Sequence, residues 1–484
     1  MNLQELLTRV GIKFALTSNP EITGVALDSR LVKAGFVFIA TAGIPLAGRT
    51  ALDGHDFIAK AIDNGAVAIV GSQSLELSVP YIQVANPRAI CALLAREIWH
   101  RPDKKLHLIG VTGSKGKSTL VALIHHILES AGLAVARMST VSIRFAGREE
   151  YLPGHFTTPE APQVYELLHR FAEAGCTHVV MEVSSHALQL ERVTGIEFEV
   201  GAWVNFYPDD HLDFHGSEQN YFAAKRLLLE RSTFAVLNAA ESYYPQLETV
   251  PHWGFGGASD WQIRQLEQTA SGLQLAVQSP LGNFAVFVPM IGDFNALNAL
   301  AALAVCAKLG LGIATLQRGL ESFGGVPGRM QIIQAEPFRV INDFAHTGAS
   351  LEVAMKTLRQ TTTGRIILVI GAAGQRDPNR RTGIGSVAAR TADHVIFTEE
   401  DSRTESTDSI LQAMKTAFLE AGGSSYQLIP DRRAALRAAI LLAVEGDTVL
   451  LAGKGHERTL ERGTEFLPWD ETLEARAVLN DHLK

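Results

Sequence analysis

The residues between Gly110 and Thr119 have the types and spacing needed to hold phosphate groups. They read Gly-Val-Thr-Gly-Ser-Lys-Gly-Lys-Ser-Thr and lie between an apolar run and a helical pattern at 117–130. Glycines let backbone N–H groups turn toward phosphate oxygens, Lys117 supplies a positive charge, and Ser118 or Thr119 can coordinate Mg²⁺. The segment therefore predicts a site for a nucleoside triphosphate. The other interpretation is an ordinary glycine-rich turn between a strand and a helix.

One feature departs from the common phosphate loop. Five residues separate Gly110 from Gly116, where the common form has four. Counted from Gly116, the first glycine of the common form would fall on Val111.

Downstream, acidic, histidine and lysine side chains follow expected strands. Glu182 comes at the end of an apolar strand expected at 177–183, where a carboxylate could bind a cation held by ATP oxygens. Alone, it could equally be a solvated acid at a strand end. His211 lies among aspartates, and Lys225 ends the string Tyr-Phe-Ala-Ala-Lys. Taken singly, these are a surface histidine and a surface lysine on an alanine-rich helix.

Together these segments resemble the Mur ligase superfamily, whose loop has the form Gly-Thr-Asn-Gly-Lys-Thr/Ser and which includes folylpolyglutamate synthases. The resemblance implies that Glu182 and His211 bind magnesium and that Lys225 is carbamylated to N6-carboxylysine. Such a modification replaces a cation with an anion that can join a metal site. The expected metal ligands are Ser118, Glu182, His211 and modified Lys225, and the expected catalytic residues are Lys117, Lys225, His211 and Glu182.

Other segments match the superfamily's substrate sites. The resemblance places the UDP-muramoyl substrate on a paired-threonine segment, on a serine and an arginine after Glu182, and on the N-terminal domain: Thr157 and Thr158 (within Phe156–Glu160), Ser184, Arg192 and Ser29. For ATP it implies the phosphate loop, an adenine-side segment, an interdomain turn and a strand end where Asp343 contacts the ribose: Gly113, Ser114, Lys115, Gly116, Lys117, Ser118, Thr119, Asn295, Asn298, Arg329, Asp343 and His346. Phe344 replaces the tyrosine usual before Ala345-His346.

The third domain of the superfamily selects the incoming amino acid. Its Asp-Asn-Pro-Arg motif, which reads diaminopimelate, corresponds here to Glu400-Asp-Ser-Arg403, and Gly453-Lys-Gly-His-Glu457 matches a segment that contacts the amino acid's ammonium group. The expected amino-acid-binding residues are Glu400, Asp401, Arg403, Gly453 and Glu457. The arginine favours diaminopimelate. Alternatively, the two acids pair with Arg403, and the site accepts lysine or ornithine.

The elements that position these residues predict an α/β protein of three domains. Expected are an N-terminal UDP-binding α/β domain (1–103), a central ATPase-like domain with a mostly parallel sheet (104–329) and a C-terminal Rossmann-like domain (330–484). Strands at 107–112, 177–183, 197–205 and 234–238 alternate with helices in the central domain. Antiparallel strands are expected within 272–289. Later strands are expected near Phe338, Arg365, His394, Tyr426 and Thr448.

The composition and charge of the chain indicate which partners and which cellular compartment to expect. The net charge of −8 comes without a long basic tract, which argues against nucleic acid as a partner. No segment has the length and apolar character of a membrane span or the pattern of a signal peptide. Cys91, Cys176 and Cys306 are widely spaced, which suits a reducing cytoplasm. We expect a cytoplasmic monomer whose partners are small molecules.

The resemblance covers nearly the whole chain and predicts a ligase of peptidoglycan synthesis. The N-terminal residues, including Leu27-Asp-Ser-Arg30, resemble the tripeptide synthetase branch, which adds the third amino acid to UDP-N-acetylmuramoyl-L-Ala-D-Glu with ATP, through an acyl phosphate. One alternative is a paralogous Mur-type ligase with another acceptor. A folylpolyglutamate synthase would lack the first domain, and a nucleotide-dependent switch would not need Glu182, His211 and Lys225.

Overall fold

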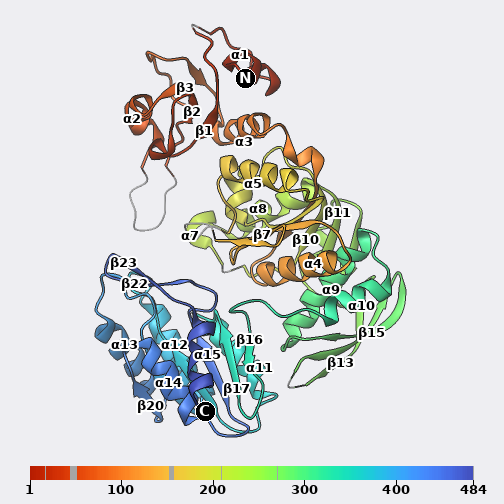
Figure 1. Cartoon of the computed structure of the whole chain (residues 1–484), viewed down its shortest axis with the longest axis vertical. Coiled ribbons are helices and arrows are strands. Elements are labelled where there is room, and N and C mark those ends of the chain that lie inside the picture. The colour runs from red at the N-terminus through yellow and green to blue at the C-terminus, as the bar shows by residue number, and fades with distance from the viewer. Residues whose placement is uncertain (17, 44–51, 152–156, 209, 270, 483–484) are drawn as a thin grey trace. The chain divides into compact units, whose positions relative to one another are not determined.

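The computed structural model describes residues 1–16, 18–43, 52–151, 157–208, 210–269 and 271–482. By their contacts, the residues form two compact units. The first comprises 1–262, 279–281 and 300–319, and the second comprises 263–278, 282–299 and 320–484. Figure 1 shows the course of the chain through both. The domain boundaries expected at 103 and 329 stay predictions.

The first unit begins with a small α/β layer. Its sheet is parallel, in the order β1-β2-β3-β4. The strands are β1 (Gly24–Ala26), β2 (Phe36–Ile39), β3 (Ala66–Gly71) and β4 (Tyr81–Gln83). The helices are α1 (Leu3–Arg9), α2 (Ile58–Asp63) and α3 (Pro87–Ile98), with short 3₁₀ turns η1 (Ser29–Leu31), η2 (Gly54–Phe57) and η3 (Pro102–Lys105).

The rest of the first unit is built on an eight-stranded sheet in the order β12-β11-β10-β5-β9-β6-β7-β8. Its first six strands run parallel, and the last two pair antiparallel at one edge. The strands are β5 (His107–Thr112), β6 (Val135–Met138), β7 (Ile143–Phe145), β8 (Arg148–Glu150), β9 (His178–Glu182), β10 (Phe198–Trp203), β11 (Ser232–Asn238) and β12 (His252–Phe255). The helices are α4 (Lys117–Ser130), α5 (Ala161–Glu173), α6 (Ser185–Gln189), α7 (Leu212–His215) and α8 (Glu218–Glu230), with the 3₁₀ turn η4 (Tyr244–Gln246).

Three neighbouring strands of this sheet end beside one another. β5 pairs in parallel with β9 on one side and with β10 on the other, and Val111 lies opposite Glu182. The carboxyl ends of parallel strands meet at one edge of the sheet, which is where α/β proteins bind ligands. The loops after β5, β9 and β10 are therefore brought together at that edge.

A small sheet and two helices follow in the chain. The sheet order is β13-β14-β15, with β13 (Gln262–Gln268), β14 (Leu273–Ser279) and β15 (Gly282–Val288), and the helices are α9 (Asp293–Lys308) and α10 (Ile313–Glu321). Only two residues join β14 to β15, and so short a connection permits only antiparallel pairing.

The last part of the second unit is a six-stranded sheet in the order β16-β17-β21-β18-β19-β20, parallel except for β16. The strands are β16 (Gln331–Gln334), β17 (Arg339–Asp343), β18 (Ile366–Ile370), β19 (His394–Phe397), β20 (Tyr426–Leu428) and β21 (Thr448–Ala452). The helices are α11 (Gly348–Arg359), α12 (Asn379–Thr391), α13 (Thr407–Glu420), α14 (Arg432–Leu442) and α15 (Glu471–His482). A separate hairpin consists of β22 (Thr459–Arg462) and β23 (Glu465–Pro468).

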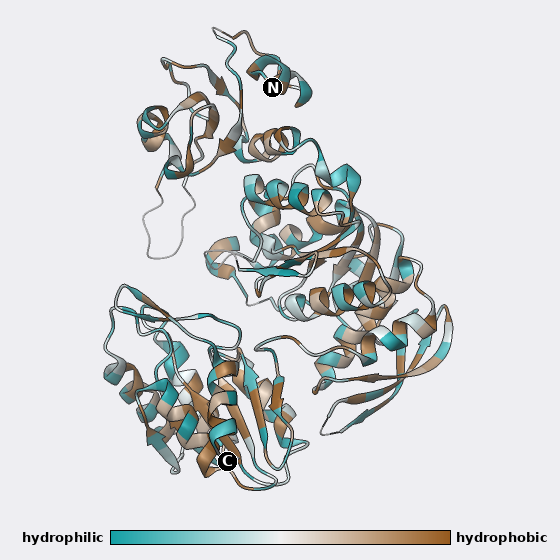
Figure 2. Ribbon diagram, in the orientation of Figure 1, coloured by the Kyte–Doolittle hydropathy of each residue, from teal (hydrophilic) through white to brown (hydrophobic). Residues whose placement is uncertain are grey.

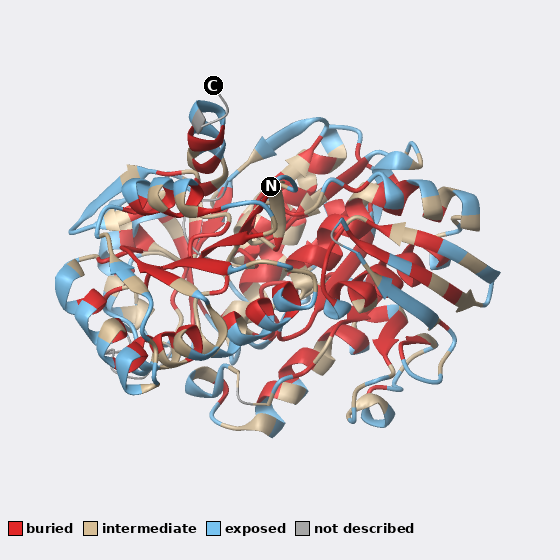
Figure 3. Ribbon diagram, turned by 90° about the horizontal axis from the view of Figure 1, so that it is seen from below, coloured by how far each residue is buried: buried red, intermediate tan, exposed pale blue. Residues whose placement is uncertain are grey.

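Apolar strands form the cores of both large sheets. All five residues of β18 and of β21 are buried, as expected for central parallel strands covered on both faces. Figure 2 shows that strands of the two large sheets are mostly hydrophobic, and Figure 3 shows buried residues in strands and in the helices that cover them. The prediction of an α/β protein with mostly parallel sheets is confirmed.

In the described part of the chain, no helix has both the length and the apolar character needed to cross a bilayer. All three cysteines are buried and carry free thiols.

Candidate active site

The phosphate loop joins β5 to α4, as its sequence predicts. Gly116 is the residue before the helix and has a φ of +81°, a left-handed conformation that glycine adopts at little cost. The α4 helix then begins at Lys117, so its free N–H groups and the positive end of its dipole face the loop. Ser118 and Thr119 lie in the first turn and are buried. This is the geometry of an anion site.

Lys117 reaches back over the loop. Its Nζ donates hydrogen bonds to the carbonyl oxygens of Gly113, at 2.8 Å, and Ser114, at 3.2 Å. A second lysine of the loop has other partners: the Lys115 N–H donates to Asn205 Oδ1 at 2.9 Å, and its ammonium group pairs with Asp210. Lys117 is thus the cation positioned where phosphate oxygens would bind.

Glu182 ends β9 and is buried beside the loop strand. Its carboxylate accepts hydrogen bonds from the Thr140 backbone N–H, at 2.8 Å, and from Thr140 Oγ1, at 3.1 Å. A buried carboxylate held by a hydroxyl and an N–H can exchange a partner for a cation more readily than one in a salt bridge. The interpretation of Glu182 as a solvated acid is wrong.

Lys225 lies on α8 and is 1% exposed. Its Nζ lies 4.6 Å from the centre of the Tyr221 ring. Burial, followed by the charge of Lys117, lowers the pKa of Lys225 well below its ordinary value, despite the opposing effect of Asp210. Lowering the pKa of a buried lysine favours its neutral, nucleophilic form over the ammonium form. The surface-lysine interpretation of Lys225 is therefore also wrong.

Tyr221 connects this lysine to the phosphate loop. Its hydroxyl lies 2.9 Å from Ser114 Oγ, and Ser114 Oγ also accepts the Tyr207 N–H. Lys225 stands one turn after Tyr221 on the same face of α8. Helix α8 thus places Lys225 near the phosphate loop, although the two are far apart in the sequence.

His211 immediately precedes α7 and adopts a left-handed φ of +57°. Its ring centre lies 4.9 Å from that of His186 and 5.8 Å from that of Tyr221. The His211 imidazole therefore lies near the Tyr221 ring, as Lys225 does. Within the described residues, no three His, Cys, Asp or Glu side chains converge on one point as a metal site.

Three residues expected on the muramoyl substrate lie together. Thr158 Oγ1 donates to the Glu182 carbonyl oxygen at 2.9 Å and lies 3.5 Å from Ser184 Oγ. Arg192 donates to the Thr158 carbonyl oxygen at 2.8 Å and to Glu160 at 2.6 Å. Thr157 adjoins them and is only partly buried, while Phe156 lies outside the described residues. The hydrogen bond from Thr158 to the Glu182 carbonyl oxygen links this cluster to Glu182.

Ser29 belongs to the N-terminal layer. It begins η1 and is buried, and its carbonyl oxygen accepts a hydrogen bond from Asn64 Nδ2 at 2.8 Å. The neighbouring Asp28 binds Arg30 through its side chain. Ser29 is thus held by its own layer.

The remaining residues expected on ATP lie in the second unit. Asn298 Nδ2 donates to Asn295 Oδ1 at 3.2 Å, and both side chains are buried. Asp343 ends β17, and its carboxylate accepts N–H groups from Met330, at 2.7 Å, and Ala345, at 2.9 Å. The same strand end holds two further predicted residues: Arg329, whose guanidinium lies 4.7 Å from the centre of the Phe344 ring, and His346, whose Nδ1 lies 2.8 Å from the Phe344 carbonyl oxygen.

The residues expected on the amino acid follow β19 and β21. Lys454 is fully buried, and its Nζ donates to Asp401 Oδ1 at 2.8 Å and to Glu457 Oε2 at 2.6 Å. Burial raises the pKa of the neighbouring Glu400 to about 7. A side chain at Gly453 would meet Glu400 Oε2 at 2.9 Å, so glycine allows this carboxyl group to approach the backbone.

Arg403 has a different partner from those considered in the sequence. Its Nε donates to Glu461 Oε2 at 2.7 Å, and its Nη1 donates to the Gly374 carbonyl oxygen at 3.0 Å. Asp401 pairs with Lys454 instead. The idea that Glu400 and Asp401 neutralise Arg403 is therefore wrong, because the β22–β23 hairpin supplies the acid.

Comparison with known proteins shows to which family this chain belongs. Models of the Mur ligase family match three successive segments: its catalytic domain at 21–99, its middle domain at 111–306 and its glutamate ligase domain at 328–455. A Deinococcus radiodurans protein called UDP-N-acetylmuramyl-tripeptide synthetase is 45% identical over 474 residues, 96% of this chain and 95% of that protein. This chain belongs to the Mur ligase family.

Other relatives agree with this membership. A Geobacillus thermodenitrificans protein called UDP-N-acetylmuramoyl-L-alanyl-D-glutamate--2,6-diaminopimelate ligase is 37% identical, covering 99% of this Mur ligase and all of that protein. A solved structure of a diaminopimelate ligase of the same name superposes with a TM-score of 0.72 at 27% identity, covering 100% of this chain and 99% of that one. This Mur ligase is an ATP-dependent enzyme that joins an acid to an amino acid.

Three residues that contact the predicted site residues of this Mur ligase were not predicted from the sequence. Thr140 holds Glu182, Tyr221 joins Lys225 to the loop, and Glu461 holds Arg403. Tyr221 lies in the string quoted for Lys225, and its spacing of four residues was the available signal. Thr140 and Glu461 carry no local signal, because they are brought in by strand order and by a distant hairpin.

A buried ion pair supports the segments that carry the residues expected to bind the amino acid. Arg432 on α14 is fully buried; it pairs with Glu471 at 2.6 Å and donates to the carbonyl oxygens of Glu399 and Ala452. These carbonyls end the segments that lead to Glu400 and Gly453. Arg432 therefore fixes the two backbones between which Lys454 is enclosed.

Replacing Arg432 with methionine is expected to lower the free energy of unfolding by about 3–5 kcal/mol, because Glu471 would be left buried and unpaired. The adjacent Arg433 is the matched control, since it also pairs with a glutamate but is 65% exposed. Arg433→Met should cost at most about 1 kcal/mol. Denaturant unfolding measures both, and equal losses would contradict the structural role of Arg432.

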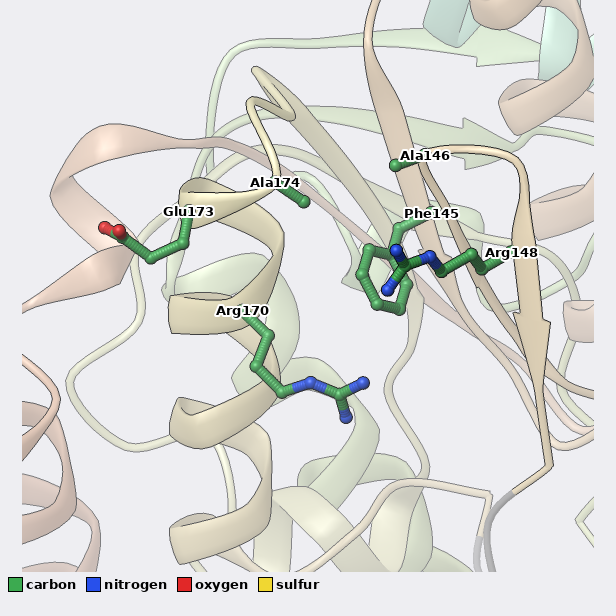
Figure 4. A pocket seen from close by; sticks show the side chains of 6 residues that line it. All are labelled: Phe145, Ala146, Arg148, Arg170, Glu173 and Ala174. Carbon is green, nitrogen blue, oxygen red and sulfur yellow. The ribbon is translucent and has the colours of Figure 1, made fainter.

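One hollow in the first unit stands apart from all these residues. It is lined by β7, β8 and the end of α5, and Figure 4 shows its side chains, among them Phe145, Arg148 and Arg170. Arg170 binds Glu150 through two hydrogen bonds. None of the predicted site residues lines this hollow.

Proposed function

We propose that this Mur ligase adds the third amino acid to UDP-N-acetylmuramoyl-L-Ala-D-Glu in peptidoglycan synthesis. The amino acid proposed is a diamino acid: diaminopimelate, lysine or ornithine. The names of the relatives support this acceptor, because those relatives match 96% and 99% of this chain. The observation that carries the chemistry is the buried Lys225 beside the phosphate loop.

The first step we propose is phosphoryl transfer to the acceptor. ATP phosphates bind the N–H groups of the loop between Gly113 and Thr119, and Lys117 balances the charge that develops on the γ-phosphoryl group. The D-glutamyl carboxylate attacks the γ-phosphorus, forming an acyl phosphate and releasing ADP. Thr158, Ser184 and Arg192 orient the acceptor, which makes the attack effectively intramolecular.

The residues present also fit magnesium and a carbamylated lysine. A hard cation prefers oxygen ligands, which Ser118, Glu182 and a carbamate on Lys225 would supply, together with the His211 imidazole. Bound Mg²⁺ would neutralise phosphate charge. A neutral buried amine is the form of Lys225 that can add CO₂.

The second step is attack by the incoming amine. The amine must be neutral to attack the acyl phosphate, and the tetrahedral intermediate then expels phosphate and leaves an amide. We propose that Gly453 and Glu457, whose carboxylate accepts a hydrogen bond from Lys454, contact the amino group of the incoming amino acid. Because these reactants are ATP and a UDP-linked sugar, we propose that the enzyme works in the cytoplasm.

The main competing proposal is a ligase with a different acceptor. The altered segment from Glu400 to Arg403 favours it, since it departs from the family's diaminopimelate motif. A folylpolyglutamate synthase structure matches only 74% of this chain, at a TM-score of 0.61 and 16% identity, which shows the fold alone. A non-enzymatic switch leaves the buried Lys225 unexplained.

Phosphate release tests the proposal directly. With ATP, Mg²⁺ and UDP-N-acetylmuramoyl-L-Ala-D-Glu, one of the three diamino acids should raise the rate at least about 100-fold over the reaction without amino acid. Mass spectrometry should show the acceptor enlarged by the mass of that amino acid minus one water. A reaction without the muramoyl acceptor is the control. No turnover with any diamino acid would contradict the proposal and favour the ligase with a different acceptor.

A further inference from the structure

We propose that Glu461 determines which distal group the amino-acid site accepts, and that it favours a lone ammonium group over a carboxylate. The substrate class is then lysine or ornithine, which reverses the preference for diaminopimelate drawn from the sequence. This inference rests on the proposed function. It concerns a residue outside all the segments that the sequence analysis considered.

The β22–β23 hairpin contacts the amino-acid segment through one parallel β-bridge, between Arg403 and Arg462. The Arg403 N–H donates to the Glu461 carbonyl oxygen at 3.0 Å, and the Gly463 N–H donates to the Arg403 carbonyl oxygen at 2.7 Å. Arg403 has a φ of +52°, a conformation that costs energy in a residue with a side chain. Two backbone hydrogen bonds therefore hold Arg403 in a strained conformation against the hairpin.

The side chain of Glu461 then engages the guanidinium group of Arg403. Nε donates to Glu461 Oε2 at 2.7 Å, and both side chains are largely buried, at 12% and 19% exposed. A guanidinium group grips a carboxylate through parallel pairs of N–H groups, one of which includes Nε. Glu461 already engages the Nε member of that pair, and the Gly374 carbonyl oxygen takes a further donor from Nη1.

The charge balance of the cluster points the same way. Around Lys454 and Arg403, the structure gathers four carboxyl groups: Glu400, Asp401, Glu457 and Glu461. Lys454 is shared between Asp401 and Glu457. Arg432 also acts on Glu400, but it is paired with Glu471. Even with one of the four carboxyl groups protonated, the acids therefore outnumber the bases. An incoming ammonium group is attracted to such a cluster, whereas an extra carboxylate must displace Glu461 or face repulsion.

Two further contacts hold the hairpin in register. The Glu461 N–H donates to Asp401 Oδ1 at 2.9 Å, and Arg462 forms an ion pair with Glu399. Every residue from 399 to 403 except Glu400 and Ser402 thus bonds to the hairpin. Glu461 is held on the segment by backbone as well as side-chain bonds, so it acts as a fixed charge.

The test compares kcat/KM for L-lysine, L-ornithine and meso-diaminopimelate in the full-length enzyme, with Glu461→Gln as the variant. The native enzyme should prefer lysine or ornithine by about tenfold or more. Glu461→Gln should move the ratio toward diaminopimelate by about tenfold, chiefly through KM, because the arginine becomes available. Glu465→Gln is the matched control, since Glu465 is an exposed glutamate on the same hairpin.

The outcomes separate this inference from the function on which it rests. Turnover that favours diaminopimelate in the native enzyme, or an unchanged ratio in Glu461→Gln, would overturn the role of Glu461 and leave the ligase activity standing. No turnover with any of the three would overturn both. Competition between equimolar lysine and diaminopimelate in the native enzyme, read by product mass, tests the preference even if the variant does not fold.

Discussion

Replacing Lys117 with methionine is expected to reduce ATP-dependent phosphate release by about 10³-fold. Lys117 begins α4 and places its ammonium group over the loop, where it donates hydrogen bonds to the carbonyl oxygens of Gly113 and Ser114. Those bonds can be exchanged for phosphate oxygens as charge develops there. Methionine keeps most of the length of the apolar stem but removes the charge.

Two measurements make this result specific. The melting temperature should change little, because Lys117 is half-buried and the rest of the loop is held by backbone geometry and by Asn205. Lys356→Met, at an exposed site on α11, is the control for loss of one positive charge. A Lys117→Met enzyme that retains a tenth or more of native turnover would show that the loop does not carry the reacting phosphate.

Replacing Lys225 with methionine is expected to reduce turnover by about 10²-fold or more, because the carbamate that would join the metal site cannot form. Methionine suits the buried position, so the change tests chemistry more than packing. Intact-protein mass spectrometry under mild, bicarbonate-containing conditions should show an added CO₂ on the native enzyme and none on the variant. Full activity in Lys225→Met would rule out a catalytic role.

The same residue predicts a pH and bicarbonate dependence of stability. Because burial lowers the folded-state pKa of Lys225 below its ordinary value of 10.5, the unfolded chain binds the extra proton between those two values. The contribution of Lys225 to stability therefore rises with pH across that window and is lost as pH falls through it.

Bicarbonate should raise the melting temperature of the native enzyme, since CO₂ binds the folded amine. Lys225→Met should show neither this increase nor the Lys225 part of the pH slope. An equal response to bicarbonate in both proteins would point to a general salt effect in place of carbamylation.

Local patterns sufficed for most elements of the fold. The helix expected at 117–130 is α4, and the strand expected at 107–112 is β5. Every strand expected in the C-terminal part was found within a few residues of its predicted place. Hydrophobic runs bounded by glycine and proline report buried parallel strands directly, because such strands are covered on both faces. The antiparallel pair within 272–289 followed from its turn.

The candidate site could be predicted only in part. The phosphate loop could be predicted because all its parts are consecutive, so backbone geometry alone places Gly116, Lys117 and Ser118. The side chains that meet it come from separate strands and helices. Neither the burial of Lys225 nor the hold of Thr140 on Glu182 has a local signature, since each depends on which strands are neighbours.

The amino-acid cluster shows this limit most clearly. From residue types, Arg403 stood next to two acids and could be paired with either, because adjacency in sequence suggests adjacency in space. In the folded chain, Asp401 turns to Lys454, and Arg403 receives Glu461 from a hairpin almost sixty residues later. Residue types and spacing therefore identify the family, the loop and the elements. The partners of each buried charge are chosen by tertiary contacts, because a charge removed from water must pair with whatever the fold places beside it.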